Sequence, residues 1–440
     1  MQDIKEQIIF KLKNKLARIG VIGLGYVGLP LVFEIAKSGF DVIGFDIDIK
    51  KVNLINKGIN YIKDVNDNEF KKLVAEEKIE ATTDFSLIKD SDCISIAVPT
   101  PLDKYKQPDI SYVETASREI AMYLKKGTLV VLESTTYPGT TKEIVKPILE
   151  SSGLKCGQDF FLAFSPERVD PGNKLYKTGN TPKVVGGVTA NCTEIAAMMY
   201  ESVLKAQVFK VSSPDVAEME KILENTFRNI NIGLVNEMAI LCNKMGINIW
   251  EVIEAAKTKP YGFMAFYPGP GLGGHCIPLD PFYLTYKARE YDYHTRLIET
   301  AGEINDYMPE FIVENITKIL NKYKKPLNGS KVLILGAAYK KDIDDVRESP
   351  AIKIIDILEK RGAEVYYNDP YVPNFLNNES GKKYFSIEWE NIINDAEIVV
   401  IVTDHSIYPY DEIVKKAKLV YDTRNATKIV SNCNEKIFKL

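Results

Sequence analysis

The chain has 440 residues, of which 45% are hydrophobic and 26% charged, with 56 Lys plus Arg against 60 Asp plus Glu. These proportions are those of an ordinary globular protein of about two to four domains, which excludes a disordered or fibrous chain. The net charge of −4 argues against a general nucleic-acid binder, whose surface is basic. No apolar run approaches the roughly 18 residues that span a bilayer, so we expect no membrane segment.

The six cysteines, at positions 93, 156, 192, 242, 276 and 433, lack the spacing of a metal site and do not suggest a disulfide framework. The N-terminal segment alternates charged and apolar residues and lacks the apolar core of a signal peptide. We therefore expect a cytoplasmic protein with no metal. Each cysteine is by default a small buried hydrophobe.

Residues 17–48 show the pattern strand, glycine turn, helix, strand. The apolar run ARIGVIG is followed by a helical pattern from Leu29 to Gly39, and DVIGFDID indicates a second strand. This order opens a parallel sheet. Further strands are expected at residues 93–101, 128–136, 160–168 and 183–188, with a helix over 112–124, and the strand signals stop near residue 210.

The apolar spacing becomes helical over residues 215–256 and again over about 280–323, where Pro309 is a kink or a new start. Strand signals return at residues 331–339, 364–370, 396–403 and 418–425, with a helix at 351–361. The segment 324–330 contains Pro, Gly and Ser and marks a boundary. The sequence thus predicts an α/β chain in which a long helical segment, a spine or a dimer surface, joins two sheet domains. The expected domains are residues 1–210, 211–325 and 326–440.

The segment GLGYVG places Gly23, Gly25 and Gly28 between the first strand and its helix, and Asp46 ends the next strand. In this context the spacing is a dinucleotide-binding fingerprint. The glycines permit a tight turn, a close approach to a pyrophosphate and close helix–strand packing, while the helix N-terminus favours negative charge. Asp46 would accept hydrogen bonds from the adenosine ribose, which predicts NAD over NADP, although the cation of Lys51 nearby would tolerate a 2′-phosphate.

The second α/β domain lacks this spacing. Gly336 follows its opening strand, but alanines fill the later positions. An ordinary pyrophosphate site is therefore not expected there. Lys340, Lys341 and Arg347 either bind phosphate groups or form a solvated surface.

Cys276 lies in the sequence FYPGPGLGGHCIPLDPFY, where glycines and prolines exclude a regular element. Asp280 follows four residues later, in the first turn of an expected helix. A thiol near a helix start can have a lowered pKa and act as a nucleophile. Adjacent side chains seldom face each other, so His275 is expected to be structural or substrate-contacting rather than a base. From the pattern alone, Cys276 is either this nucleophile or a buried hydrophobe.

The chain contains, in this order, the motifs GLGYVGLP, GFDID, VPTP, ESTTYPGT, FSPERVDPGN, EMEKILENTFRNINIGLVNE, GPGLGGHCIPLDP and AAYKKDIDDVRESP. Together they resemble the nucleotide-sugar dehydrogenase family, the UDP-glucose/GDP-mannose dehydrogenases. The resemblance implies two Rossmann-like domains, which bind NAD (residues 1–210) and a UDP-sugar (residues 326–440), and a helical segment that forms a homodimer. It also implies oxidation of a primary alcohol on a nucleotide sugar to a carboxylate, consuming two NAD⁺.

The same resemblance implies catalytic roles. Cys276 would capture the aldehyde as a thiohemiacetal, which a second hydride transfer converts into a thioester. The i, i+4 spacing of Lys221 and Asn225 places them on one helical face. Lys221 would stabilise the developing oxyanion or help to move the alcohol's proton, and Asn225 would position the oxygen or a water. Asp280 would hold Lys221 and the water, and Glu167 would serve thioester hydrolysis.

Ligand contacts follow from the resemblance as well. The expected NAD contacts beyond the three glycines are Val27, Asp46, Lys51, Thr100, Thr135 and Arg347. The expected substrate contacts are Glu167, Arg168, Val169, Lys221, Asn225, Arg228, Lys340 and Arg424. Thr135 would also lie near the active-site water. Lys340 and Arg424 would hold the UDP diphosphate and sugar. Arg168 and Arg228 are candidates for the acetamido or carboxylate group.

The motif GGHC departs from the GGSC-like motif of the UDP-glucose branch. Together with FSPERVDPG, it is most similar to the branch that oxidises UDP-N-acetylglucosamine to the uronic acid. UDP-N-acetylmannosamine and UDP-N-acetylgalactosamine dehydrogenases share GGHC with different flanks. The resemblance thus makes UDP-N-acetylglucosamine the expected substrate and the other two sugars its alternatives, with no nucleic-acid or membrane partner.

Two other classes of protein remain to be compared. A single-step hydroxyacid dehydrogenase shares the glycine fingerprint and a helical spine, but it would give Cys276 no role and have no second α/β domain. A binding protein that senses NAD or a UDP-sugar would be expected to lack Cys276, Lys221 or Asn225, and the chain has all three.

Overall fold

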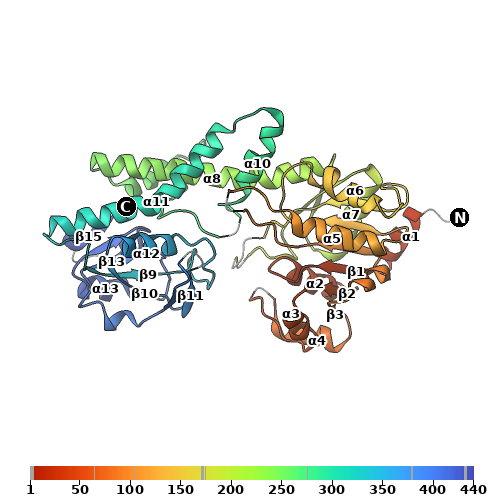
Figure 1. The fold of residues 1–440 in the computed structure, drawn as a ribbon, viewed down its shortest axis with the longest axis horizontal. Coiled ribbons are helices and arrows are strands. Elements are labelled where there is room, and N and C mark those ends of the chain that lie inside the picture. The colour runs from red at the N-terminus through yellow and green to blue at the C-terminus, as the bar shows by residue number, and fades with distance from the viewer. Residues whose placement is uncertain are drawn as a thin grey trace. The chain divides into compact units, whose positions relative to one another are not determined.

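The computed structural model describes residues 4–63, 65–103, 105–169, 173, 175–274, 276–377, 380–430 and 434–440. The chain divides into two compact units (Figure 1). Unit 1 comprises Met1–Glu224 and Phe282–Tyr293, and unit 2 comprises Asn225–Pro281 and His294–Leu440. Two helices, α8 (Pro214–Met245) and α10 (Asp280–Ala288), continue from one unit into the other.

Unit 1 is built on an eight-stranded sheet with the order β3-β2-β1-β4-β5-β6-β7-β8. Its strands are β1 (Arg18–Ile22), β2 (Asp41–Phe45), β3 (Ile79–Thr82), β4 (Cys93–Ile96), β5 (Leu129–Leu132), β6 (Phe161–Phe164), β7 (Lys183–Gly187) and β8 (Val208–Val211). Neighbouring strands are parallel except β6 and β7, which are antiparallel. The strand order reverses between β1 and β4, the point where such sheets bind ligands at the carboxyl ends of their strands.

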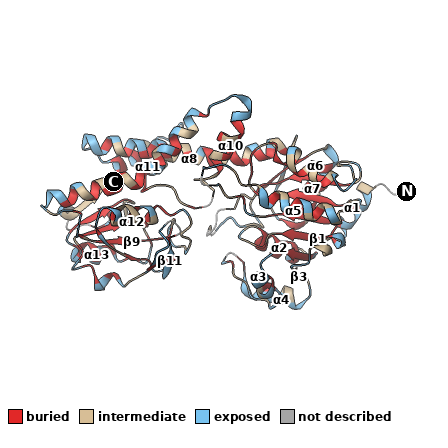
Figure 2. Ribbon diagram, viewed as in Figure 1, coloured by how far each residue is buried: buried red, intermediate tan, exposed pale blue. Residues whose placement is uncertain are grey.

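Helices cover both faces of this sheet. They are α1 (Ile4–Lys13), α2 (Gly28–Lys37), α3 (Ile49–Asn56), α4 (Asp67–Ala75), α5 (Ser111–Tyr123), α6 (Lys146–Glu150) and α7 (Ala190–Val203). Helices α2 and α7 pack into one apolar cluster, and α5 and α6 into another. The central strands are therefore buried on both faces (Figure 2), and apart from Ser95 in β4 the strands β4, β5 and β6 are apolar.

Unit 2 is built on a five-stranded parallel sheet with the order β10-β9-β13-β14-β15, beside an antiparallel pair, β11 and β12. Its strands are β9 (Lys331–Leu335), β10 (Glu364–Asn368), β11 (Asn374–Leu376), β12 (Lys383–Phe385), β13 (Ile398–Ile401), β14 (Val420–Asp422) and β15 (Ile437–Lys439). Its further helices are α9 (Ile249–Lys257), α11 (Arg296–Lys322), α12 (Pro350–Lys360) and α13 (Tyr410–Lys416). Here the order reverses between β9 and β13, so the loops after these strands form the second expected ligand crevice.

The predicted fold class is confirmed, because the chain is α/β with two Rossmann-like domains joined by a long helical segment. The prediction of one helical stretch over residues 215–256 is wrong in detail, because α8 ends before Gly246, whose φ of +72° stops a helix. The stretch at 280–323 is also two helices, separated near Asp292, whose φ is +53°. Pro309 lies inside α11 and does not start it.

Within unit 2, the long helices α8 and α11 pack closely. A Cβ on Gly233 would lie 3.0 Å from the Cβ of Ala301. One turn further, Nδ2 of Asn236 donates to Oδ1 of Asn305 at 2.8 Å. One face of α8 is thus used inside the unit, which leaves its opposite face for other contacts.

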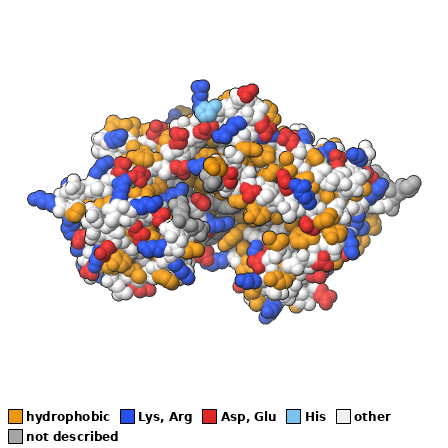
Figure 3. Space-filling view, viewed as in Figure 1, with side chains coloured by type: hydrophobic (Ala, Val, Ile, Leu, Met, Phe, Trp, Pro, Cys, Tyr) orange, Lys and Arg blue, Asp and Glu red, His pale blue; other side chains and the backbone are white. Residues whose placement is uncertain are grey.

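Acidic and basic side chains are interspersed on the face of each unit that Figure 3 shows. Among the described helices, none has both the length and the apolar character needed to cross a bilayer. No group of three or more His, Cys, Asp or Glu side chains in the described part of the chain is arranged to hold a metal ion.

Candidate active site

The glycine turn after β1 lies where the strand order of unit 1 reverses. Gly23 has a φ of +91°, and a Cβ there would lie 2.5 Å from the main-chain oxygen of Ala97. A Cβ on Gly28 would lie 1.8 Å from the oxygen of Gly23, so α2 can start this close to β1 only with glycine. No other described segment comes within 4 Å of the place where a Cβ of Gly25 would be. The backbone at Gly25 is therefore open to a ligand.

The carboxylate of Asp46, at the end of β2, is buried beside this turn. It accepts hydrogen bonds from the main-chain N–H groups of Leu24 and Asp48, both at 2.9 Å, and pairs with the amine of Lys51 at 3.2 Å. A carboxylate has about four acceptor positions, so one remains for a ribose hydroxyl. Because the charge of Lys51 is paired with Asp46, Lys51 is less suited to hold the 2′-phosphate of NADP.

Helix α2 completes this part of the site. Its N-cap residue, Val27, gives no side-chain hydrogen bond to the helix. Among the first residues of α2, the N–H group of Leu29 donates to the main-chain oxygen of Gly25 at 3.1 Å, and Pro30 has no N–H group. The dipole of α2 favours an anion at this end of the helix. The open turn, the uncapped helix start and the remaining acceptor of Asp46 fit the pyrophosphate and ribose of NAD.

Thr100 and Thr135 follow the neighbouring strands β4 and β5. The hydroxyl of Thr100 donates to the main-chain oxygen of Thr135 at 2.7 Å, and the hydroxyl of Tyr283 donates to the main-chain oxygen of Thr100. The two threonines expected to touch NAD are thus tied together at the carboxyl edge of the sheet, beside the strand that carries the glycine turn.

Glu167 follows β6 at the same edge. Its Oε1 accepts hydrogen bonds from the main-chain N–H groups of Arg168 and Val169, both at 2.8 Å. Its main-chain oxygen accepts one from Nζ of Lys221 at 2.5 Å. Burial acts to raise the pKa of this carboxyl, but the charge of Lys183 and the N–H groups hold it below its ordinary value. Glu167 is therefore ionised at neutral pH, as a group that takes a proton from water must be.

The guanidinium group of Arg168 is already engaged. It donates to the carboxylate of Glu224, pairs with Glu220 at 3.4 Å and donates to the main-chain oxygen of Pro182 at 3.0 Å. These contacts tie the loop after β6 to α8 and to the start of β7. A contact between Arg168 and the sugar stays a prediction.

In unit 2, α8 holds the turn that carries Cys276. The main-chain oxygen of Cys276 accepts a hydrogen bond from the N–H group of Asp280 at 2.9 Å, so the thiol lies one turn before α10. Nδ2 of Asn225 donates to Oδ2 of Asp280 at 2.5 Å, and Nδ2 of Asn229 donates to the main-chain oxygen of Ile277 at 3.1 Å. Helix α8 thus fixes both ends of the turn, while Cys276 stays partly exposed.

Asn229 is a residue of this site that the sequence analysis misses. It continues the spacing of four that joins Lys221 and Asn225, and this periodicity is a signal that could have found it. Arg228 donates to Oδ1 of Asn225, which orients the amide nitrogen toward Asp280. The predicted contact between Asp280 and Lys221 stays a prediction.

The glycine-rich segment before Cys276 packs against the loop after β9. A Cβ on Gly273 would lie 2.5 Å from the Cβ of Tyr339. The N–H group of Gly274 donates to the main-chain oxygen of Arg347 at 3.0 Å. Glycines here allow the cysteine turn and the loop of Lys340 to meet within one unit.

The two predicted UDP-binding cations lie close to this segment in the fold of unit 2. Lys340 follows Tyr339 and is half-buried. A Cβ on Gly269 would lie 2.5 Å from a guanidinium nitrogen of Arg424, whose Nε donates to the main-chain oxygen of Val402 at 2.9 Å. Arg347, predicted to reach NAD, pairs with Asp345 at 2.7 Å.

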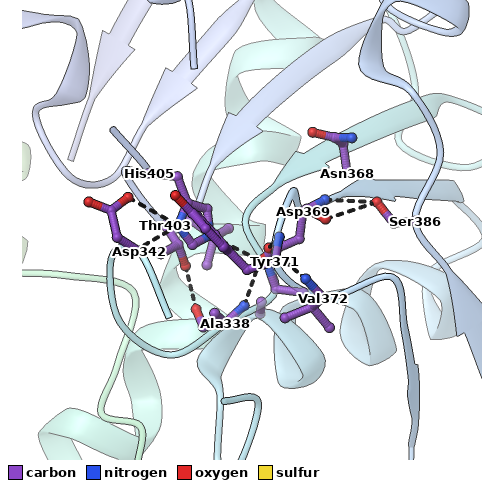
Figure 4. A network of polar contacts seen from close by, with 12 residues as sticks. Ala338, Asp342, Asn368, Asp369, Tyr371, Val372, Ser386, Thr403 and His405 are labelled. Atoms are coloured by element: carbon purple, nitrogen blue, oxygen red, sulfur yellow. Dashed lines mark hydrogen bonds and ion pairs between the residues drawn. The ribbon is translucent and has the colours of Figure 1, made fainter. Parts of the chain in front are cut away.

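Asp369, at the end of β10, has the place in unit 2 that Asp46 has in unit 1 (Figure 4). Its carboxylate accepts hydrogen bonds from five donors, which are the N–H groups of Ala337, Ala338, Tyr371 and Val372 and Nε2 of His405. These donors exhaust the acceptor positions of a carboxylate. They also use the N–H groups that would otherwise face a pyrophosphate. Unit 2 therefore lacks the features that fit a dinucleotide in unit 1.

The predicted catalytic residues are divided between the two units. Thr135, Glu167 and Lys221 belong to unit 1, and Asn225, Cys276 and Asp280 belong to unit 2. His275 lies outside the described residues. Lys221 and Asn225 are one turn apart on the single helix α8, with Lys221 bonded to the Glu167 loop and Asn225 to the cysteine turn.

These features are typical of a two-domain NAD-dependent oxidoreductase. One Rossmann-like sheet has a turn that fits NAD, the second has no such turn, and a long helix holds the cysteine turn. Models of the UDP-glucose/GDP-mannose dehydrogenase family match the chain in three parts: the NAD binding domain at residues 17–204, the central domain at 215–307 and the UDP binding domain at 333–429. The chain belongs to the UDP-glucose/GDP-mannose dehydrogenase family, and its cofactor is NAD.

Three similar proteins differ in the sugar that they are named for. UDP-N-acetyl-D-glucosamine 6-dehydrogenase from Pseudomonas aeruginosa is 38% identical, over 81% of this chain and 83% of its own. The structure of a UDP-D-ManNAc dehydrogenase from Pyrococcus horikoshii matches with a TM-score of 0.86 at 35% identity, over 96% of this chain and 98% of its own. That of an NDP-N-acetyl-D-galactosaminuronic acid dehydrogenase from Methanosarcina mazei Go1 matches with a TM-score of 0.84 at 32% identity, over 100% and 98%.

Proposed function

We propose that this protein oxidises the primary alcohol of a UDP-N-acetylhexosamine to a carboxylate, and that the sugar is UDP-N-acetyl-D-glucosamine. One alcohol, one water and two NAD⁺ would give one carboxylate, two NADH and three protons. The observation that carries the proposal is the turn from Cys276 to Asp280, which Asn225 and Asn229 hold. A single oxidation needs no thiol, whereas a second oxidation at the same carbon is assisted by a nucleophile that tethers the aldehyde.

In the first oxidation, Lys221 and Asn225 act on the alcohol oxygen. NAD⁺, when bound, accepts a hydride in each of the two oxidations. The alcohol oxygen loses its proton, and the ammonium group of Lys221 stabilises the negative charge that develops there. Asn225, oriented by Arg228, positions this oxygen or a water. Thr135 lies at the edge of the sheet that carries the glycine turn and contacts the nicotinamide and the water.

In the second oxidation, the sulfur of Cys276 bonds to the aldehyde carbon and the aldehyde oxygen takes a proton, which gives a thiohemiacetal. Loss of a hydride and a proton from this adduct leaves a thioester. Glu167 then accepts a proton from a water whose oxygen attacks the thioester carbon. The carbon–sulfur bond breaks, the acid is released and the thiol of Cys276 is restored.

The remaining predicted contacts divide between the two ligands. NAD contacts the residues of the glycine turn, Asp46 and Thr100 in the domain of residues 1–210, and Arg347 reaches it from the C-terminal domain. Lys340 and Arg424, in the domain of residues 326–440, hold the UDP diphosphate and sugar. The central residues 211–325 supply Lys221 and Cys276. The contacts of Arg168, Val169 and Arg228 with the sugar or its acid belong to the same proposal.

The choice of N-acetylglucosamine is supported by the motif GGHC with its flanks and by the similarity to the Pseudomonas aeruginosa enzyme. The other two similar proteins are named for N-acetylmannosamine and N-acetylgalactosaminuronic acid, which makes these sugars the alternatives. We propose a cytoplasmic location as well, in keeping with the free thiols of Cys93, Cys156, Cys192 and Cys242.

The proposed assembly is a homodimer formed through α8. Among the large apolar side chains that α8 exposes, five lie in its unit 2 part, and they are Phe227, Leu234, Met238, Leu241 and Met245. Their spacing of seven, four, three and four residues keeps them on one face, as in a helix that packs along a partner helix. Such a contiguous apolar face on a surface helix is typical of an interaction site.

The experiment that tests the sugar is a comparison of kcat/KM for NADH formation with UDP-GlcNAc, UDP-ManNAc, UDP-GalNAc and UDP-glucose. We expect UDP-GlcNAc to exceed each of the others by at least about tenfold, the ratio that one well-placed contact gives. A higher kcat/KM with another N-acetylhexosamine would overturn the choice of sugar and keep the reaction. No NADH with any of the four would overturn the proposed reaction itself.

A further inference from the structure

A lysine is buried between two glutamates in unit 1. The side chain of Lys183, the first residue of β7, is only 5% exposed. Its Nζ lies 2.8 Å from Oε2 of Glu133, the residue after β5, and 3.5 Å from Oε2 of Glu167. The buried hydroxyl of Tyr200, on α7, donates to Oε1 of Glu133 at 2.8 Å, and Nζ of Lys183 lies 5.1 Å from the centre of the Tyr200 ring. Neither Lys183 nor Glu133 has a role in the reaction as described so far.

Burying three charges together has a cost that their mutual attraction only partly offsets. A well-packed apolar side chain at position 183 would fill the same space without this cost of burying charge. Packing alone therefore does not explain why a charged residue stands at position 183. The groups that its charge stabilises are the two carboxylates beside it. One of them, Glu167, is the proposed base of the hydrolytic step.

Lys183 is the cation that faces the side-chain carboxylate of Glu167. Among the described residues, the other charged groups around this loop come from the loop itself and from α8, and they are Arg168, Glu220, Lys221 and Glu224. The guanidinium of Arg168 is neutralised by the two glutamates of α8. The amine of Lys221 donates to the main-chain oxygen of Glu167.

We propose that Lys183 is a positioning residue for the hydrolytic step, which holds the carboxylate of Glu167 in place and in its ionised form, with Glu133 sharing its charge. Oε2 of Glu167 faces Lys183 while Oε1 accepts the N–H groups of Arg168 and Val169, so the carboxylate is fixed from both sides. This inference rests on the proposed role of Glu167.

The electrostatics agree with this geometry. Burial acts to raise the pKa of Glu167, and the charge of Lys183 is the largest of the effects that hold it below the ordinary value. Burial acts to lower the pKa of Lys183, but the charges of Glu133 and Glu167 raise it above the ordinary value. Lys183 thus stays charged through the range in which Glu167 titrates. Without it, two carboxylates would share an apolar site and the pKa of Glu167 would rise.

Two substitutions should shift the pKa of Glu167 in opposite directions, and a third should leave it in place. Lys183→Met removes the charge and nearly keeps the length of the side chain. Glu133→Gln removes the carboxylate that competes for Lys183 and keeps an acceptor for the hydroxyl of Tyr200. Lys183→Arg retains the charge and is the matched control.

The readout is the pH dependence of kcat for uronic acid formation. Hydrolysis needs ionised Glu167, so its rate falls as the pH falls through the pKa of that group. Lys183→Met should move this acid limb to higher pH by about one unit or more. Glu133→Gln should move it to lower pH, and Lys183→Arg should leave it within a few tenths of a unit of the wild type. Acid limbs of Lys183→Met and Glu133→Gln that coincide with the wild type would overturn the inference, whatever the change in absolute rate.

A second measurement needs no substrate. The ¹³C resonance of the Glu167 side-chain carboxyl group, in protein labelled at glutamate and identified by its loss in Glu167→Gln, reports the titration directly. It should titrate at higher pH in Lys183→Met and at lower pH in Glu133→Gln. These shifts without any turnover would refute the proposed reaction and keep the electrostatic role of Lys183. Turnover together with an unmoved resonance would refute the role of Lys183 and leave the proposed reaction intact. If Lys183→Met does not fold, the direction of the shift in Glu133→Gln alone tests the role of Lys183.

Discussion

Asp46 and Asp369 show how neighbours decide what a residue can do. Each ends the second strand of its sheet and accepts hydrogen bonds from the turn after the first strand. Asp46 has three donors and keeps an acceptor position, whereas Asp369 has five, one of them the buried His405. The same residue type thus leaves an acceptor for a ligand in unit 1 and stabilises a loop in unit 2.

Asp46→Asn tests the ribose contact. The amide retains the size of the carboxylate but loses its charge and one acceptor, so NAD binding should weaken by about 1.5–3 kcal/mol, the worth of a hydrogen bond to a charged group. The KM for NAD⁺ should rise by about tenfold to a hundredfold. The KM for the UDP-sugar serves as the internal control and should stay the same, and an unchanged response to NAD⁺ would place the cofactor elsewhere.

Cys276→Ser tests the nucleophile. A hydroxyl is a far weaker nucleophile than a thiol, so uronic acid formation should fall by about a thousandfold or more, as when other enzymes lose their nucleophile. Chromatographic separation of the nucleotide sugars after reaction measures this loss. Cys156→Ser, a half-buried cysteine outside the proposed site, is the control and should keep the wild-type yield. A full yield of NADH and uronic acid from Cys276→Ser would remove this residue from the mechanism.

At the scale of elements, α8 combines several tasks because its faces differ. Lys221, Asn225 and Asn229 repeat at intervals of four and contact the loops that carry Glu167 and Cys276. Gly233 and Asn236 face α11. The ring of Phe227 meets the ring of Phe266 edge-on at 5.7 Å, and the proposed dimer would cover the exposed apolar face from Phe227 to Met245.

Leu234→Glu combined with Leu241→Glu tests that dimer. Two buried carboxylates at an apolar interface are strongly unfavourable, so the variant should be a monomer. Light scattering after gel filtration should give twice the chain mass of 49.6 kDa for the wild type and the single mass for the variant. Lys244→Glu, which changes an exposed residue of the same helix outside this face, should remain a dimer. A wild-type monomer would contradict the proposed assembly.

The sequence predicts buried elements better than exposed ones. Strands such as β5 and β13 are buried on both faces and therefore form continuous apolar runs. The strand β3, with the sequence IEAT, alternates buried and exposed residues, and no strand is predicted there. The end of α8 at Gly246 is missed because the apolar periodicity continues into α9.

The partners of charged residues are beyond the reach of a single sequence. Lys183 and Glu133 are 50 positions apart and meet only because β5, β6 and β7 are neighbours in the sheet. Arg168 is predicted to contact the sugar, yet the structure shows it paired with two glutamates of α8, 52 and 56 positions away. The positions of the candidate site follow from motifs, but their ion pairs depend on the strand order.

At the scale of the whole molecule, two Rossmann-like domains have taken different roles through the chemistry of their first turns. The first keeps an open glycine turn for NAD, and the second closes its turn on Asp369 and presents Lys340 in the loop that follows. The cysteine turn packs against that same loop within unit 2. These parts fit the proposed reaction, in which a UDP-linked sugar is oxidised twice at one carbon.

The number of NADH molecules formed per sugar at completion tests this central claim most directly. Purified protein with excess NAD⁺ and a limiting, known amount of UDP-GlcNAc should form two NADH per sugar and convert the sugar to its uronic acid. The same ratio with another UDP-N-acetylhexosamine would keep the two-step mechanism and change only the sugar. One NADH per sugar, with an aldehyde as the product, would contradict the role of Cys276 and the four-electron reaction.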